Sequence, residues 1–272
     1  MQKYSIFNLI KNAFSSHENW EVAWKDPTPK KSYDVIIIGG GGHGLATAYY
    51  LAKEHNITNV AIIEKGWIGG GNVGRNTTII RSNFMHDANG RFNEFSMDLW
   101  RNMSQELNFN VMFSPRGIIN LAHSDAQMNA YARRGNSMRL NGIDAVLLNR
   151  EQVKKLIPMA DFSEDVRFPI FGGLMQPSAG TARHDAVAWG YARQADSMGV
   201  DIIQNCEVIG FDVVGGKIKG VRTSKGDIKA NKIGLCVAGS TSILAEKLNM
   251  TLPIETHLLQ ACVSEPIKPL LD

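Results

Sequence analysis

The stretch VIIIGGGGHGLATAYYLA, from Val35 to Ala52, places five glycines within six residues between an apolar run and an amphipathic run. Its first four residues are β-branched and do not alternate with polar ones, which is typical of a strand buried on both faces. The run Leu45–Lys53 has the pattern of a helix. Between the two, Gly39, Gly41 and Gly44 have the G-x-G-x-x-G spacing. In that spacing the glycines permit a tight turn, the approach of a pyrophosphate, and close packing of helix on strand.

Glycine also collects in ordinary turns, so the residues that follow decide between the two interpretations. The sequence NVAIIEKG supplies a second apolar strand, Val60–Ile63, which leads into Glu64. Glu64 lies twenty residues after Gly44, where an acidic side chain can accept hydrogen bonds from a pair of ribose hydroxyls. A strand-helix-strand unit with acid and glycines in register favours a dinucleotide site over a structural turn. The amide N–H groups at the start of the helix would then face the phosphates.

The length, charge and hydropathy of the chain limit the classes of function that it can have. The 272 residues suffice for one large or two modest domains. The net charge of +3 is small and spread along the chain, so nucleic acid binding is not expected, whereas an acidic small substrate is compatible with it. No run of about 18 apolar residues is present, so we expect no membrane helix. The N-terminal residues also lack the pattern of a secretory signal.

The three cysteines show no C-x-x-C pair and no spacing typical of metal ligands. We therefore expect no metal site. Buried, unpaired thiols are characteristic of a reducing compartment, so the sequence predicts a cytoplasmic protein. The residues concerned are Cys206, Cys236 and Cys262.

Hydrophobic periodicity predicts two long helices after the glycine-rich unit, over residues 88–108 and 125–141, with a strand at GIINLAH between them. Asn149 is the predicted N-cap of a shorter helix that Pro158 ends. The first of the long helices is expected to bury an apolar face formed by Phe92, Phe95, Leu99 and Met103.

A further helix is predicted to start near Asp185 and to end at Gly199. Residues 200–214 and 217–224 are predicted to form strands joined by a two-residue hairpin turn at Gly215 and Gly216. The meander continues into a buried strand that ends at Ala238-Gly239.

Three further stretches, GGNVGRNTTIIRSNF, QPSAGTARHDAVAW and GVDIIQNCEVIGF, resemble the β subunits of heterotetrameric sarcosine oxidases, among the amine-oxidising flavoproteins of the D-amino-acid oxidase type. The similarity runs from about Trp20 to the last residue. It implies an α/β (α+β) fold: a Rossmann-like FAD-binding domain of the glutathione-reductase type with an interleaved, incomplete substrate-binding domain. The family's β subunits are longer, so the chain is expected to be C-terminally truncated relative to them.

The resemblance also implies a domain division. Residues 1–31 would form an N-terminal arm that packs on a neighbour, followed by a linker that contains proline and lysine. The FAD-binding domain would occupy residues 32–86 and 149–248. The substrate domain would occupy residues 87–148 and begin again over residues 249–272.

Several residues match positions that hold FAD non-covalently in the family. Val208 matches the strand whose backbone reads the adenine edge, and His43 can equally be a solvent-facing loop residue. The expected FAD-binding residues are Gly39, Gly41, His43, Gly44, Glu64, Asn72, Arg75, Thr77, Ile79, Val208, Ala238 and Gly239.

Two further positions carry the chemistry that the resemblance implies. Arg81 matches the arginine that pairs with the substrate carboxylate in related monomeric sarcosine oxidases, and a planar guanidinium suits that task. A surface salt bridge is its alternative role. His184 matches a histidine that carries FMN covalently through a ring nitrogen, with Arg183 beside the FMN phosphate. A histidine that merely starts a helix is the plain alternative.

The implied reaction is oxidative demethylation of sarcosine to glycine, with oxygen as acceptor, hydrogen peroxide as product and a one-carbon unit for tetrahydrofolate. The implied partners are the α, γ and δ subunits, with NAD and tetrahydrofolate bound outside this chain. Three different functions stay open: a truncated, non-catalytic fragment that binds FAD, another FAD-dependent amine or amino-acid oxidoreductase or dehydrogenase, and an NAD(P)-dependent dehydrogenase. The last uses the same glycine motif but does not require the segments GTARHDAVAW and CVAGS.

Overall fold

The computed structural model describes residues 6–16, 18, 22–260, 262, 265 and 268. The chain divides into two compact units. Unit 1 comprises Met1–Asn76, Leu107–Phe109 and His184–Gln260, and unit 2 comprises Thr77–Glu106, Asn110–Arg183 and Ala261–Asp272.

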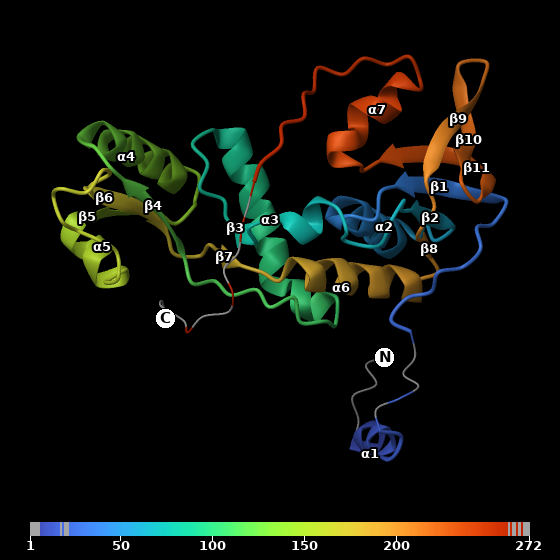
Figure 1. Ribbon diagram of the computed structural model, residues 1–272, viewed down its shortest axis with the longest axis horizontal. Helices are drawn as coiled ribbons and strands as arrows, with labels where there is room; N and C mark the ends of the chain where they lie inside the picture. Colours follow the sequence, from blue (N-terminus) through green and yellow to red (C-terminus); the bar gives the residue numbers. More distant parts are fainter. Residues whose placement is uncertain are drawn as a thin grey trace. The chain divides into compact units, whose positions relative to one another are not determined.

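Unit 1 is organised around a six-stranded sheet in the order β8-β2-β1-β11-β10-β9 (Figure 1). Strands β8, β2, β1 and β11 run parallel, whereas β10 and β9 extend the sheet antiparallel. Every residue of β2 is buried, as the apolar run predicted. The strands are β1 (Ser32–Ile38), β2 (Val60–Ile63), β8 (Asp201–Ile203), β9 (Val208–Val214), β10 (Lys217–Thr223) and β11 (Gly226–Leu235).

Two helices of unit 1, α2 (Gly42–His55) and α6 (His184–Ser197), lie side by side (Figure 1). They meet through the rings of Tyr49 and Tyr191, whose centroids are 5.5 Å apart. Aromatic pairs at this separation add to the stabilisation from burial. The remaining helices of the unit are α1 (Ile6–Phe14), η1 (Asn72–Arg75), η2 (Ala238–Ser240) and α7 (Thr241–Glu246).

Unit 2 contains a three-stranded antiparallel sheet in the order β4-β6-β5 and a separate two-stranded ribbon, β3-β7. Helices α4 and α5 contact the larger sheet. The core beneath α4 includes Met138, Ile143 and Leu174, all at most 1% exposed. The elements are β3 (Ile79–Ile80), α3 (Asp87–Glu106), β4 (Ile118–Ala122), α4 (Asp125–Leu140), β5 (Val146–Asn149), α5 (Arg150–Leu156), β6 (Gly172–Gln176) and β7 (Gly180–Thr181).

The mixed α/β architecture and most predicted elements are confirmed. The hairpin turn has positive φ at both Gly215 and Gly216, 58° and 72°, as a type I′ turn requires. Asn149 caps α5 with a full capping box: its side chain accepts from the amide of Gln152, and the Gln152 side chain accepts from the amide of Asn149.

Three local expectations were only partly right: Met103 of the expected apolar face and Cys206 are buried as predicted, but the rest differs. Helix α3 buries Gly90, Met97 and Met103, whereas Phe92 and Phe95 are 74% and 65% exposed, because a different stripe of the helix faces the unit. The strand expected over 200–214 is interrupted, since the amide of Cys206 turns to bond the carbonyl of Glu64 between β8 and β9. Of the cysteines, Cys206 is buried, Cys236 half-buried and Cys262 exposed.

The division into units also differs from the expected domain boundaries. Residues 77–86 and 149–183 group with unit 2 instead of with the dinucleotide-binding part. The physical reason is strand pairing: β6 lies between β4 and β5, and β7 pairs with β3, so both segments are tied to the smaller unit.

Gly44 provides a test of this packing. A Cβ at Gly44 would overlap the carbonyl oxygen of Gly39, which is backbone and cannot rotate away. Gly44→Ala should therefore lower the free energy of unfolding by roughly 3 kcal/mol, measured by thermal or denaturant unfolding. Gly234→Ala is the control, because its Cβ would meet only the Ile37 side chain at 4.0 Å. Equal stabilities of the two variants would contradict the tight turn.

Candidate functional site

The glycine-rich turn brings three backbone segments together at the carboxyl end of β1. Gly39 has φ of +109°, and a Cβ there would overlap the carbonyl oxygen of Cys236, which follows β11. The amide of Cys236 in turn donates to the carbonyl of Ile38 at 2.8 Å. In open parallel sheets this is the end where dinucleotides bind.

Glu64 lies beside this turn and bonds to backbone amides. Its Oε2 accepts from the amide of Gly40 at 2.8 Å and its Oε1 from the amide of Gly66 at 2.9 Å. A carboxylate has about four acceptor positions, so each oxygen retains capacity for one more donor. The half-buried Glu64 is therefore held in place and still able to accept ribose hydroxyls.

Of the other unit 1 residues predicted for FAD, those on η1 and η2 follow β2 and β11, whereas Val208 lies on β9, the edge strand beyond β10. The amide of Gly69 donates to the carbonyl of Gly40 at 3.1 Å, which ties the segment before η1 to the turn. Asn72 and Arg75 are exposed on η1. Val208 is buried at the start of β9, while Ala238 and Gly239 are exposed on η2, with φ of +46° at Ala238.

His43 is exposed on the first turn of α2. Its carbonyl accepts from the hydroxyl of Thr47 at 2.7 Å. The shallow groove that it lines follows the outer side of the helix and is formed by His43, Ala46, Thr47, Tyr50, Leu51 and His55. This position is compatible both with a solvent-facing histidine and with one that contacts bound FAD.

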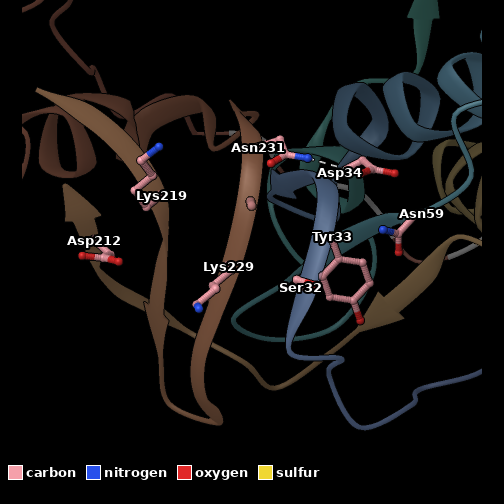
Figure 2. A pocket seen from close by; sticks show the side chains of 9 residues that line it. Ser32, Tyr33, Asp34, Asn59, Asp212, Lys219, Lys229 and Asn231 are labelled. Atoms are coloured by element: carbon pink, nitrogen blue, oxygen red, sulfur yellow. Dashed lines mark hydrogen bonds between the residues drawn. The ribbon is translucent and has the colours of Figure 1, made fainter. Parts of the chain in front are cut away.

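A polar pocket lies at the opposite end of the sheet (Figure 2). It surrounds Ser32, Tyr33 and Asp34, where β1 begins, whereas the glycine turn follows the end of that strand. The Asn231 amide donates to Asp34 across it at 3.3 Å. Because ligands of such sheets bind at the carboxyl ends of the strands, this pocket is separate from the dinucleotide site.

The segment that carries Arg81 belongs to unit 2 and runs antiparallel to the chain that leads to Arg183. Ile79 pairs with Thr181, and the amide of Ala182 donates to the carbonyl of Thr78 at 3.1 Å. Thr78 has φ of +63°, a strained conformation for a β-branched residue and one that concentrates at functional sites. Thr77 and Ile79 are exposed.

The Arg81 guanidinium is held from two directions. Its Nη1 donates to the side-chain oxygen of Asn83, and its central carbon lies 4.9 Å from the ring centroid of Phe84. Within the described residues, no carboxylate forms an ion pair with Arg81. The surface salt bridge considered as its alternative role is therefore absent from the part of the chain described.

A buried polar network adjoins Arg81, and sequence reasoning missed it. Ser82, Asn83 and Gln176 are all fully buried. The amide of Ser82 donates to Gln176 Oε1 at 3.0 Å, and the Ser82 hydroxyl donates to Glu94 at 2.6 Å. The one available signal was the polar pair Ser82-Asn83 directly after an apolar strand.

His184 begins α6 and has one buried ring nitrogen. Its Nδ1 is the buried side-chain atom without a hydrogen-bond partner among the residues described. An unpartnered buried nitrogen costs free energy unless another group meets it, so this atom suits a histidine that carries a bonded group. The amide of neighbouring Arg183 donates to the carbonyl of Val111 at 3.0 Å.

Comparison with known proteins assigns the family. Residues 34–271 match the family described as FAD dependent oxidoreductase. The chain belongs to the FAD-dependent oxidoreductases. The match includes the glycine turn, Glu64, Arg81 and His184.

Among relatives of this FAD-dependent oxidoreductase, sarcosine oxidase subunit beta of Rhizobium meliloti (strain 1021) is 58% identical over 99% of the chain. Sarcosine oxidase subunit beta of Rhodobacter capsulatus is 52% identical over 100% of it. The chain spans 65% and 66% of the length of these two relatives. The crystal structure of L-proline dehydrogenase from P. horikoshii has a TM-score of 0.76 and 28% identity, covering 84% of this chain and 58% of that one.

The structure thus places the expected residues of the FAD-dependent oxidoreductase in two groups. Unit 1 brings the glycine turn, Glu64, η1 and the end of β11 together, and the bare backbone at Gly41 and the acceptor Glu64 suit the ADP half of FAD chemically. Unit 2 brings Arg81 and the strand before Arg183 together. Among the helices in the described ranges, none has the length and apolar character needed to cross a membrane.

A substitution of Gly41 tests FAD binding without disturbing the fold. A Cβ there would meet only Val73 Cγ2, at 3.7 Å, and the extended backbone of Gly41 suits any residue. We expect purified Gly41→Val protein to retain little or no FAD, because the side chain fills the space for the pyrophosphate. The measurement is the ratio of flavin to protein absorbance after purification.

The control for this experiment is His55→Ala, an exposed change at the far end of the helix that Gly41 caps. It should leave the FAD content unchanged. Circular dichroism of both variants checks that the fold is retained. Equal FAD content in Gly41→Val and the parent enzyme would refute the glycine site.

Proposed function

We propose that this chain is the β subunit of a multi-subunit sarcosine oxidase that demethylates sarcosine to glycine. The observation that carries the proposal is the 58% identity over 99% of the chain to a protein named sarcosine oxidase subunit beta. Because the chain spans 65% of that relative, the activity, substrate and partners of the whole protein all belong to the proposal.

In this proposal FAD lies across the glycine turn, with its ribose on Glu64. The bonds from Gly40 and Gly66 hold the carboxylate for that contact, and the amides at the start of α2 face the pyrophosphate. When bound, the two flavins would supply the redox chemistry, that is, acceptance of a hydride equivalent from the N-methyl carbon and delivery of the electrons to oxygen. The FAD-binding residues are Gly39, Gly41, His43, Gly44, Glu64, Asn72, Arg75, Thr77, Ile79, Val208, Ala238 and Gly239.

Arg81 is proposed to bind the substrate carboxylate. The guanidinium keeps donors beyond the one that Asn83 occupies, and no carboxylate in the described ranges neutralises it. A planar guanidinium can donate two parallel hydrogen bonds to a carboxylate, which fixes the orientation of the rest of the substrate.

His184 is proposed to carry FMN covalently, with Arg183 close to the FMN phosphate. The support is the buried, unpartnered Nδ1 at the start of α6. The helix N-terminus also favours an anionic group nearby.

The remaining parts of the proposal concern the complex. Hydrogen peroxide is the reduced oxygen product, and the one-carbon unit passes to tetrahydrofolate. The α, γ and δ subunits are the partners, with NAD and tetrahydrofolate bound outside this chain, and the complex is cytoplasmic. The word subunit in the names of the relatives supports an assembly of several chains.

A second candidate function is an FAD-dependent amine or amino-acid dehydrogenase. The TM-score of 0.76 to an L-proline dehydrogenase is the observation that favours it. Kinetics with sarcosine, dimethylglycine and L-proline, each with oxygen and with an artificial electron acceptor, separate the two candidates. A preference for L-proline, or turnover without oxygen consumption, would replace the first proposal by the second.

Arg81 is tested with a substrate pair that differs only in the carboxylate. Arg81→Ala in the assembled enzyme should raise the KM for sarcosine about 100-fold, because a charge-assisted bidentate contact is lost. The KM for N-methylglycinamide, which has no carboxylate, should stay nearly constant. Arg81→Lys should recover only part of the loss, since an ammonium lacks the planar fork. Unchanged discrimination between the two substrates would show that another residue holds the carboxylate.

His184 is tested by mass spectrometry of the assembled enzyme. After acid precipitation and digestion, the peptide that contains His184 should carry the added mass of FMN, whereas FAD is released. His184→Ala should lose this adduct, keep FAD and slow the transfer of electrons to oxygen. His86→Ala, at an exposed histidine, serves as the control and should keep the adduct. An unmodified His184 peptide from an active enzyme that contains FMN would refute the assignment.

A further inference from the structure

Asn83 connects three polar side chains of unit 2 and is fully buried. Its side-chain oxygen accepts from Arg81 Nη1, and its side-chain amide donates to Asn120 Oδ1 at 2.7 Å. Its backbone carbonyl accepts from Arg134 Nε at 2.6 Å and also from Arg134 Nη2. Both the side chain and the backbone of Asn83 are therefore fixed.

Arg134 comes from the middle of α4, 51 residues further along the chain. Two of its N–H groups converge on a single carbonyl, so its planar guanidinium is held in one orientation. Within the described residues, neither Arg134 nor Arg81 forms an ion pair with a carboxylate. Two positive side chains thus meet on one neutral residue.

The two charges influence each other. Burial, and secondarily the positive charge of Arg81, lower the pKa of Arg134 from its ordinary value. Arg134 stays protonated at neutral pH, because an arginine begins so far above it. Two uncompensated guanidinium groups at one place create a positive potential that an anion relieves.

We propose that Asn83 is the positioning residue of a two-arginine carboxylate site: Asn83 orients Arg81, and Arg134 and Asn120 hold Asn83. This inference rests on the proposed role of Arg81 in binding the substrate carboxylate. Arg134 also adds a second positive charge to the site without touching the substrate.

The geometry explains how this arrangement serves recognition. A guanidinium has five N–H donors, and the bond to Asn83 occupies one of them on Nη1. The ring of Phe84 lies 4.9 Å from the guanidinium carbon and further restricts its rotation. Donors that are already oriented lose less conformational entropy when the carboxylate binds. The expected effect of the network is therefore on the affinity for carboxylates and not on the chemical step.

The decisive experiment compares Arg134→Met with Arg133→Met in the assembled enzyme. Arg133 is the exposed neighbour on the same helix and serves as the matched control. Arg134→Met should raise the KM for sarcosine about ten-fold. It should leave kcat and the KM for N-methylglycinamide within about two-fold, whereas Arg133→Met should change none of these values. Arg134→Lys should fall between the parent and Arg134→Met, since it keeps the charge but loses the two-donor contact.

Asn83→Asp is the second variant, because it keeps the shape of the side chain while it places a carboxylate against Arg81. That internal carboxylate should compete with the substrate and raise the KM for sarcosine more than Arg134→Met does. The N-methylglycinamide kinetics again report whether the site has folded. In an Arg81→Ala background, Arg134→Met should raise the KM for sarcosine by a smaller factor than in the parent enzyme, because the effect through Arg81 is gone and only the direct effect of the Arg134 charge remains.

The outcomes separate this inference from the proposed function. If Arg81→Ala loses affinity for sarcosine but Arg134→Met and Asn83→Asp do not, the inference about Asn83 is overturned. The proposed role of Arg81 would still stand. Equal losses for sarcosine and N-methylglycinamide in Arg134→Met would also overturn it, since they indicate a purely structural role. No loss of sarcosine affinity in Arg81→Ala would overturn the proposed role of Arg81, and with it the inference.

Discussion

The contact on which unit 1 depends is the approach of backbone to backbone at the end of β1. Gly39 touches the carbonyl of Cys236 after β11, and Gly44 at the start of α2 touches the carbonyl of Gly39. A side chain at either glycine would separate segments that must meet, so the turn, the helix and the neighbouring strand are placed together. Glu64 then reaches Gly40 across the turn.

The part of this constraint that lies between β1, α2 and β2 is local, which explains why sequence reasoning predicted that part well. The glycine spacing, the two apolar runs and the acid all lie within about thirty residues. A short stretch of sequence is therefore enough to predict the βαβ unit. The position of β11 next to β1 had no comparable signal. Val35 pairs with Lys232, and no local periodicity predicts a contact over that separation. The helix Ala88–Asn108 was likewise predicted nearly in full. Its buried face was predicted only in part, because Met103 is buried but Phe92 and Phe95 are exposed, and tertiary packing selects the side that turns inward.

Unit 2 was harder to predict because its strands are short and unusual in composition. β6 is GGLMQ and β7 is only Gly-Thr, so neither has the β-branched, alternating pattern of a typical strand. β6 is nevertheless central, because its glycines let β4 and β5 approach closely: a Cβ at Gly173 would lie 2.9 Å from the carbonyl oxygen of Asn120. Arg81 was found through a resemblance, whereas Arg134 comes from a distant helix and carries no motif of its own.

Asn83, the residue that holds Arg81, is neutral, and its neutrality affects how the arginine can bind an anion. An internal aspartate or glutamate would also fix a guanidinium, but the substrate carboxylate would then have to displace it. Asn83 fixes the same group through an amide oxygen and leaves the full positive charge available. Two half-buried acids of the network, Glu94 and Asp144, are instead bonded by Ser82 and Ser178. Glu94 also pairs with Arg101, and Asp144 also accepts from the amide of Ser178. Neither acid is paired with Arg81 or Arg134 in the described part of the chain, so the two charges of the arginine pair persist in the folded protein.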